Sequence, residues 1–129
     1  MPDAMPAAVP VGLLLSDDLI FSSRITGTAR ALGLAVEPAR SAEALVELAR
    51  QQAPRCVLLD LANPGLVLGG LLRQLAEVCP VLPRVVAYGS HVDTATLRAA
   101  REAGCDPVLP RSKFVEELPR ALPEWLSAR

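Results

Sequence analysis

Three aspartates stand at the ends of two apolar runs of the sequence, one of which is separated from its aspartates by Ser16. Asp17 and Asp18 follow the run Val11–Leu15, and Asp60 follows Cys56–Leu59. Unbroken apolar runs of this length are typical of parallel strands that are covered on both faces. If the two strands are neighbours, their carboxyl ends bring the three carboxylates within several Å of one another. Two like charges about 4 Å apart repel by roughly 4 kcal/mol at an effective dielectric constant of about 20. We therefore expect that one carboxyl group takes up a proton or that a cation binds.

Magnesium is the cation that suits such a cluster, because it prefers oxygen ligands and keeps several of its waters. A carboxylate beside Mg²⁺ can attack a phosphoryl donor and form an aspartyl phosphate. The sequence thus offers Asp60 as a nucleophile, with Asp17, Asp18 and Asp60 as metal ligands. A plainer interpretation stands beside this one: Asp18 caps the following helix, and Asp60 forms a turn.

Other residue types that carry chemistry are scarce. His91 is the single histidine, which excludes a site with several histidine ligands and leaves only an adjacent Ser90–His91 pair for hydrolysis. Neighbouring residues rarely point at each other, so hydrolysis is the last of the alternatives. The cysteines, Cys56, Cys79 and Cys105, are odd in number and lack the spacing of a zinc site. They are interpreted as thiols in a reducing cytoplasm.

The composition restricts the class of protein. A chain of 129 residues with 51% hydrophobic residues is long and apolar enough for one folded domain. A net charge of -1 and 3% aromatic residues do not favour nucleic-acid binding. No apolar run is long enough to span a membrane, and the start of the chain lacks the pattern of a signal peptide. We expect a flexible arm over residues 1–10, a single domain over 11–129 and a cytoplasmic location.

Short apolar runs alternate with helical patterns along the chain. Ser41 and Asp93 can cap two of the helices, and Gly33 can end another. Pro119 and Pro123 are expected to bend the last helix or to delay its start. Strands are predicted at 11–15, 34–36, 56–59, 84–87 and 107–109, the fifth at a sheet edge, and the last helix at about 114–126.

Five such β-α units predict an α/β fold with an open parallel sheet between two layers of helices. The turn Ser16–Leu19 is acidic and has no glycine, and no glycine-rich phosphate loop occurs anywhere. This excludes the six-strand dinucleotide order and favours a flavodoxin-like fold with the strand order 2-1-3-4-5. A small flavin-binding domain of the same order remains an alternative, although the acidic turn would repel a flavin phosphate.

Three segments together resemble a known family. They are Leu13–Asp18, Leu58–Pro64 and Ala103–Arg111. In order and spacing they are similar to the receiver domains of two-component response regulators, over residues 11–126. The resemblance implies a signal-transduction domain and not an enzyme, with other signalling proteins, such as a histidine kinase, as partners. It also implies contacts, including a homodimer, through the last two helices.

The resemblance assigns roles to the acidic residues. Asp60 is then the phosphoacceptor, Asp17 and Asp18 are the acidic pair that holds Mg²⁺, and Pro64 stands four positions beyond the phosphoacceptor, as in the family.

Two positions depart from the pattern of the family. Receivers carry Ser or Thr at the end of strand four, where this chain has Gly89 with Ser90 one place late. They also carry Lys followed by Pro after strand five, where this chain has Arg111 followed by Ser112. The single lysine, Lys113, would point the same way as Arg111 if strand five continued that far. The sequence therefore predicts a stand-alone, atypical receiver (a pseudo-receiver) with a weak conformational response to phosphoryl groups. An interaction module that never needs phosphorylation is the chief alternative.

Overall fold

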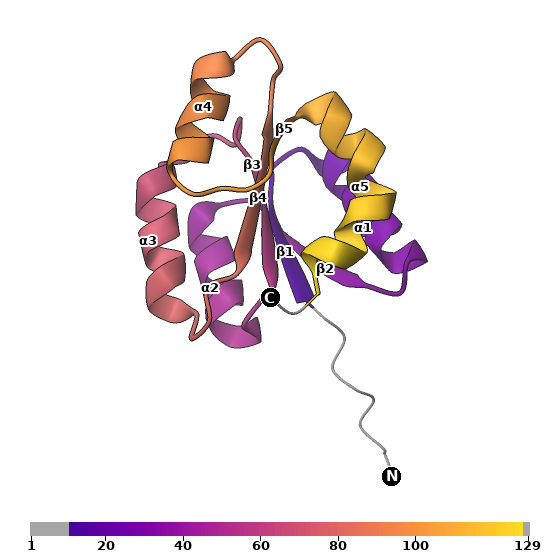
Figure 1. Cartoon of the computed structure of the whole chain (residues 1–129). Coiled ribbons are helices and arrows are strands. Elements are labelled where there is room, and N and C mark those ends of the chain that lie inside the picture. Colours follow the sequence, from indigo (N-terminus) through magenta and orange to yellow (C-terminus); the bar gives the residue numbers. More distant parts are fainter. Residues whose placement is uncertain (1–10, 128–129) are drawn as a thin grey trace.

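Five parallel strands form one central sheet in a computed structural model that describes residues 11–127. The sheet order is β2-β1-β3-β4-β5, as predicted for a flavodoxin-like fold (Figure 1). The predicted arm over residues 1–10 lies outside the described residues. The strands are β1 (Val11–Leu15), β2 (Ala35–Ala39), β3 (Cys56–Asp60), β4 (Arg84–Gly89) and β5 (Val108–Pro110).

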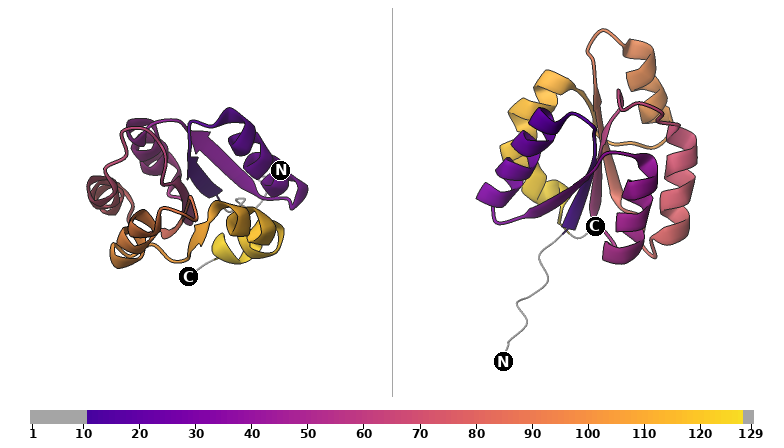
Figure 2. Two further views of the ribbon diagram at one scale, coloured as in Figure 1. Left: turned by 90° about the horizontal axis from the view of Figure 1, so that it is seen from above. Right: turned by 180° about the vertical axis from the view of Figure 1, so that it is seen from behind.

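Helices cover both faces of the sheet, which gives three layers (Figure 2). One face carries α1 (Leu19–Ala31) and α5 (Arg111–Trp125). The opposite face carries α2 (Ala42–Gln52), α3 (Leu68–Val78) and α4 (Thr94–Glu102). Among the helices of residues 11–127, none is long and apolar enough to cross a membrane.

The caps predicted for the first, second and fourth helices are confirmed. Asp18, Ser41 and Asp93 are N-caps, and each side chain accepts a hydrogen bond from a backbone N–H three residues further on. Gly33 follows the C-cap of α1 with φ +74°, a conformation that glycine adopts without steric cost. These local signals mark where α1, α2 and α4 begin and where α1 ends.

Both edge strands differ from the predicted boundaries. β2 runs over Ala35–Ala39 instead of 34–36 and contains Pro38. β5 runs over Val108–Pro110 instead of 107–109. A proline removes one ladder hydrogen bond, and an edge strand tolerates this loss because it pairs on one side only. The prediction that the fifth strand lies at an edge is confirmed.

The last helix begins earlier than predicted, at Arg111 instead of about residue 114. Pro119 and Pro123 lie inside α5 and do not delay its start. The buried face of the helix, which includes Phe114 and Trp125, packs against the sheet and stabilises the helix despite the two missing N–H groups. Because α5 begins at Arg111, strand five does not continue toward residue 113.

Candidate functional site

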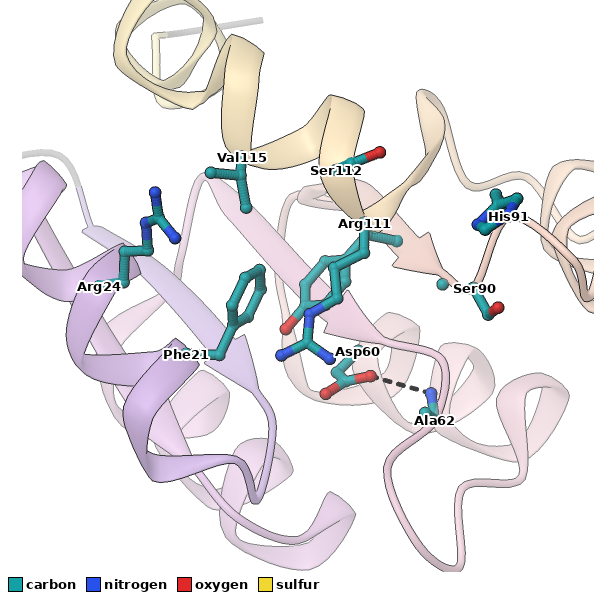
Figure 3. A pocket seen from close by; sticks show the side chains of 11 residues that line it. Phe21, Arg24, Asp60, Ala62, Ser90, His91, Arg111, Ser112 and Val115 are labelled. Atoms are coloured by element: carbon teal, nitrogen blue, oxygen red, sulfur yellow. Dashed lines mark hydrogen bonds between the residues drawn. The ribbon is translucent and has the colours of Figure 1, made fainter.

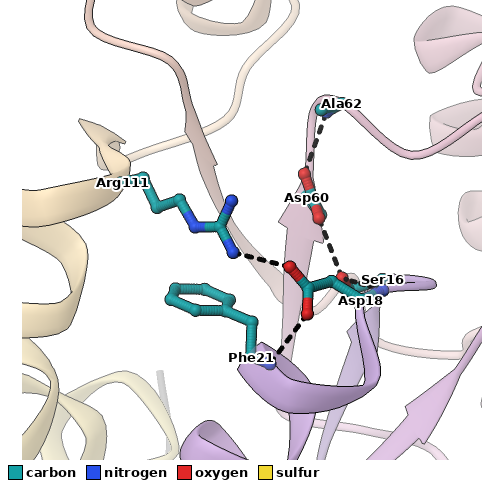
Figure 4. Close-up of polar contacts among 6 residues, drawn as sticks. All are labelled: Ser16, Asp18, Phe21, Asp60, Ala62 and Arg111. Atoms are coloured by element: carbon teal, nitrogen blue, oxygen red, sulfur yellow. Dashed lines mark hydrogen bonds and ion pairs between the residues drawn. The ribbon is translucent and has the colours of Figure 1, made fainter.

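Asp60 is the last residue of β3, the central strand, and its carboxylate is buried. Oδ2 accepts a hydrogen bond of 2.8 Å from the Ser16 hydroxyl, and Oδ1 accepts one of 2.9 Å from the Ala62 backbone N–H (Figure 4). Both carboxylate oxygens are therefore bound within the protein. Asp60 joins the loop after β1 to the loop after β3.

Ser16 is the functional neighbour that the sequence analysis missed. Leu15 of β1 pairs with Leu59 of β3 in the sheet. The residues that follow them, Ser16 and Asp60, therefore lie side by side. Ser16 is fully buried, and its oxygen also accepts a hydrogen bond from the Asp18 N–H at 3.2 Å. The sequence does contain a signal for this contact. Ser16 and Asp60 are each the first polar residue after an apolar run, and these two residues form the hydrogen bond.

The Asp18 side chain makes two contacts with other residues. Its Oδ1 accepts the Phe21 N–H at 2.9 Å as the cap of α1, and its Oδ2 lies 2.8 Å from Nη2 of Arg111. The hydrogen bond from Phe21, and next the one from Arg111, hold the pKa of Asp18 below its ordinary value. The cation beside Asp18 is thus the guanidinium of Arg111.

Arg111 reaches this position from the first turn of α5. Its guanidinium lies 4.0 Å above the centre of the Phe21 ring, in the geometry of a cation–π contact (Figure 4). Arg111 therefore ties α5 to α1 through an ion pair and an aromatic stack. A planar guanidinium suits both contacts, whereas the compact ammonium of a lysine makes a weaker match.

The side chains do not fit the expected Mg²⁺ site. Asp60 has a serine beside it, Asp18 is bound to Arg111, and Asp17 is exposed. Across residues 11–127, no three His, Cys, Asp or Glu side chains are placed so that they could share a metal ion. The prediction that the three carboxylates cluster overlooked the register, which places a hydroxyl next to Asp60.

The switch residues lie in two different environments. Gly89 ends β4, and Ser90 is exposed, where its hydroxyl accepts the Val92 N–H at 3.3 Å. Lys113 lies 3.2 Å from Glu116 and 3.6 Å from Glu117 on the outer side of α5, and Glu116 above all raises the pKa of Lys113. The hypothesis that Lys113 reaches Asp60 along strand five is wrong, because that segment is helical.

A pocket of about 730 Å³ opens beside Asp60, between α1, the loop after β4 and the start of α5 (Figure 3). Tyr88 forms part of its wall, and its side chain is almost fully buried. Burial, and then the charge of Asp60, raise the pKa of the Tyr88 hydroxyl, which keeps it protonated. The pocket is lined by Phe21, Arg24, Asp60, Ala62, Tyr88, Gly89, Ser90, His91, Arg111, Ser112 and Val115.

Ser90 and His91 both line this pocket, but no hydrogen bond joins their side chains in the described structure. A serine nucleophile needs a base within hydrogen-bonding reach, so the arrangement does not favour a hydrolase.

Comparisons of the sequence and comparisons of the fold with known proteins give different results. No family model and no curated protein matches the sequence. Solved structures match closely in shape, with TM-scores near 0.77. The receiver domain of NtrX from Brucella abortus is 22% identical, with a TM-score of 0.76 over 89% of this chain and 97% of that one.

Two further matches point the same way. A CheY-like receiver domain protein from Methanospirillum hungatei is 17% identical, with a TM-score of 0.77 over 92% of this chain and 94% of that one. A putative response regulator from Chloroflexus aurantiacus is 20% identical, with a TM-score of 0.78 over 92% and 98%. The chain therefore has the fold of the receiver domains of response regulators.

Proposed function

We propose that this chain is an atypical receiver-fold signalling module that acts by contacting other proteins and does not need metal-assisted phosphorylation of Asp60. The carboxylate of Asp60 carries the proposal. Both of its oxygens accept hydrogen bonds from the protein, and one of the two donors is the hydroxyl of Ser16. A phosphoacceptor needs an oxygen that is available for attack and a cation that neutralises the incoming phosphoryl group.

The residues around Asp60 support the same proposal. Gly89 offers no hydroxyl, and Lys113 is bound to glutamates on its own helix. A ligand shifts a conformational equilibrium only through contacts that differ between the two states. Without a hydroxyl and a lysine that close on a phosphoryl group, such contacts are few, and Arg111 already holds α5 against α1.

The surface that a partner would cover consists of exposed apolar side chains near the carboxyl ends of the strands, which we call the carboxyl edge. Leu19 and Ile20 lie in the first turn of α1, Val67 is the N-cap of α3, and Val92 precedes α4. Four of the seven large apolar side chains that are exposed in residues 11–127 thus lie at this end of the domain, and exposed apolar side chains favour protein contact. Signalling proteins, a histidine kinase among them, are the partners that this fold suggests, and a homodimer through α4 and α5 is a further arrangement to test.

Phosphorylation of Asp60 is the second candidate, because Asp60 lines the pocket and a small donor can approach it. Incubation with acetyl phosphate and Mg²⁺, followed by intact-mass measurement, separates the two functions. We expect no mass gain, and no amide shifts over residues 88–114 with beryllofluoride. A phosphoryl adduct that Asp60→Asn abolishes would overturn the proposal.

The surface is tested with photo-crosslinking residues at two exposed positions. Position 20 lies at the carboxyl edge, and position 81, similarly exposed, lies in the loop before β4 at the opposite edge. We expect crosslinks to other proteins in cells from position 20 and not from position 81. Equal crosslinking from both positions would mean that the carboxyl edge is not the contact surface.

A further inference from the structure

A groove lies at the end of the sheet where the strands begin, opposite the carboxyl edge. It is lined by residues 53–55 before β3, by residues 80–82 before β4, and by Ser127, and its volume is about 330 Å³. Val81 and Leu82 are 76% and 61% exposed, although both side chains are apolar. Exposed apolar side chains beside a groove are typical of a contact surface. We call this surface the amino-edge groove.

The chain enters the sheet beside this groove. The backbone oxygen of Val11, the first residue of β1, accepts a hydrogen bond of 2.9 Å from the Arg55 N–H. Residues 1–10, the N-terminal arm, join the sheet at Val11. Ten extended residues span at most about 35 Å, whereas neighbouring strands lie only about 4.8 Å apart. Because β3 is next to β1 and β4 is next to β3, the arm is long enough to reach the whole groove.

The composition of the arm complements the groove. Nine of its ten residues, MPDAMPAAVP, are apolar if the prolines are counted, and Asp3 is its single charged side chain. On the side of the groove, Arg55 is exposed and forms no ion pair with any carboxylate of residues 11–127. The arm and the groove therefore match in polarity and in charge.

Two properties of the arm lower the free-energy cost of docking. Its attachment at Val11 gives it an effective concentration at the groove in about the millimolar range, so a weak contact is sufficient. Its three prolines restrict the backbone, so less conformational entropy is lost when the arm is held in one place. We propose that the N-terminal arm docks in the amino-edge groove of the same molecule, with apolar side chains on Val81 and Leu82 and with Asp3 beside Arg55.

This inference goes beyond the proposed function and does not rest on it. The two surfaces lie at opposite ends of the sheet. An arm in the amino-edge groove covers apolar surface within the molecule and leaves the carboxyl edge open to other proteins.

The two methionines of the chain, Met1 and Met5, provide a direct test, because both lie in the arm. Photo-methionine places a crosslinking group in the arm of the full chain and nowhere else. After irradiation and proteolysis, mass spectrometry identifies the residues that the arm contacts. We expect crosslinks to residues 53–55 and 80–82. A mixture of isotope-labelled and unlabelled protein shows whether both crosslinked peptides come from one molecule, which is the expected result.

Two matched double variants test the apolar contact. Val81→Ser with Leu82→Ser removes it, and Leu19→Ser with Ile20→Ser makes the same change in two exposed side chains of the carboxyl edge. All four side chains are exposed, so both variants should fold. We expect the first variant to weaken docking by about tenfold or more, with a corresponding loss of crosslinks, and the second to leave the crosslinks unchanged.

A second pair of variants tests the charge. Arg55→Gln should weaken docking by about two- to fivefold at low salt, which is the range of an exposed ion pair. Arg98→Gln, which removes an exposed arginine of α4 outside the groove, should leave the crosslinks unchanged.

Three results would overturn the inference. The first is an arm that forms no crosslinks to the groove or forms them evenly over the surface. The second is crosslinking between two molecules, which would show that a second copy receives the arm. The third is a yield of crosslinks that the changes at Val81 and Leu82 leave as it was. None of these results bears on crosslinks from position 20 or on Asp60, so the proposed function is tested separately.

Discussion

The two faces of the sheet are built from different kinds of side chain. All four aromatic residues of the chain lie in the core beneath α1 and α5: Phe21, Tyr88, Phe114 and Trp125. The core beneath α2, α3 and α4 contains aliphatic side chains and two cysteines, and no aromatic ring. Both cores are well buried, so the difference lies in shape and chemistry and not in exposure.

The aromatic face is the one that carries the pocket. Phe114 stacks on Tyr88 with ring centres 4.4 Å apart and on Trp125 at 5.8 Å, and Phe21 lies 5.2 Å from Tyr88. Arg111 then rests on the outer ring, Phe21. Rigid rings with few rotatable bonds hold polar groups at fixed positions. The comparison teaches that the aliphatic face stabilises the fold, while the aromatic face both stabilises the fold and positions the site.

Removal of the Phe114 ring, which stacks on two other rings, should have the largest effect on stability. Phe114→Ala is expected to lower the free energy of unfolding by about 3–5 kcal/mol, because it leaves a cavity among three other rings. Leu45→Ala in α2, also fully buried, is the matched change on the aliphatic face and should cost about 2–5 kcal/mol. Urea unfolding measures both.

The fluorescence of Trp125 distinguishes the two variants before they unfold. Phe114→Ala should shift the emission of the folded state, because Phe114 stacks on Trp125. Leu45→Ala should not, since the sheet separates Leu45 from that ring. An unchanged emission in folded Phe114→Ala would show that the aromatic stack does not position its members.

The Ser16–Asp60 pair is expected to have the next largest effect. Asp60→Ala leaves the Ser16 hydroxyl and the Ala62 N–H without their acceptor, and Ser16→Ala leaves one oxygen of Asp60 without a donor. A buried polar group without its partner costs about 1–3 kcal/mol, so both variants should lose stability by that order. Asp60→Asn retains one acceptor oxygen and should lose less.

The direction of the stability change on Asp60→Ala also tests the functional proposal. A carboxylate kept ready for phosphorylation would be under-bonded, so its removal would leave stability unchanged or raise it. A gain in stability on Asp60→Ala, measured by urea unfolding, would therefore favour the phosphoacceptor function over the proposed one.

The sequence was sufficient to predict the fold because its signals are local. Apolar runs define the strands, and Ser41, Asp93 and Gly33 mark helix ends through bonds within four residues of chain. The strand order followed from the acidic first turn without glycine. The start of α5 was not predicted, because the packing of Phe114 and its neighbours against the sheet outweighs the two prolines.

The site was predicted only in part because its contacts depend on register. Asp60 was correctly placed at a strand end, but a shift of one residue decides whether Ser16 or Asp17 stands beside it. The contact between Arg111 and Asp18 joins residues 93 positions apart, and no local pattern announces it. A proton or a bound cation was expected at the acidic loop, whereas the ion pair of Asp18 with Arg111 was not predicted.

A titration tests the two contacts of Asp18, first the hydrogen bond from the Phe21 N–H and then the ion pair with Arg111. The pKa of Asp18 is lowered in the folded state from about 3.8. Its contribution to stability is therefore fully present above the pKa of the unfolded chain and is lost as the pH falls through the lower folded value. We expect unfolding measurements between about pH 2 and 6 to show a steeper acid loss in the parent protein than in Asp18→Asn. Parallel pH profiles would contradict the assignment.

Lys113 should give the smallest effect, and it contrasts with Arg111 two residues before it. Lys113 is about half exposed, and among residues 11–127 it pairs only with glutamates of its own helix, so Lys113→Gln should leave the free energy of unfolding unchanged within error. Arg111→Gln loses the contact with Asp18 and the stack on Phe21, so it should lower the urea midpoint and shift the amide signals of α1.

If Lys113→Gln instead perturbed the signals around Asp60, Lys113 would reach the site in solution, and the resemblance to a switching receiver would extend further than this structure indicates. If only Arg111→Gln perturbs them, the arginine is the residue of this segment that connects α5 to the site.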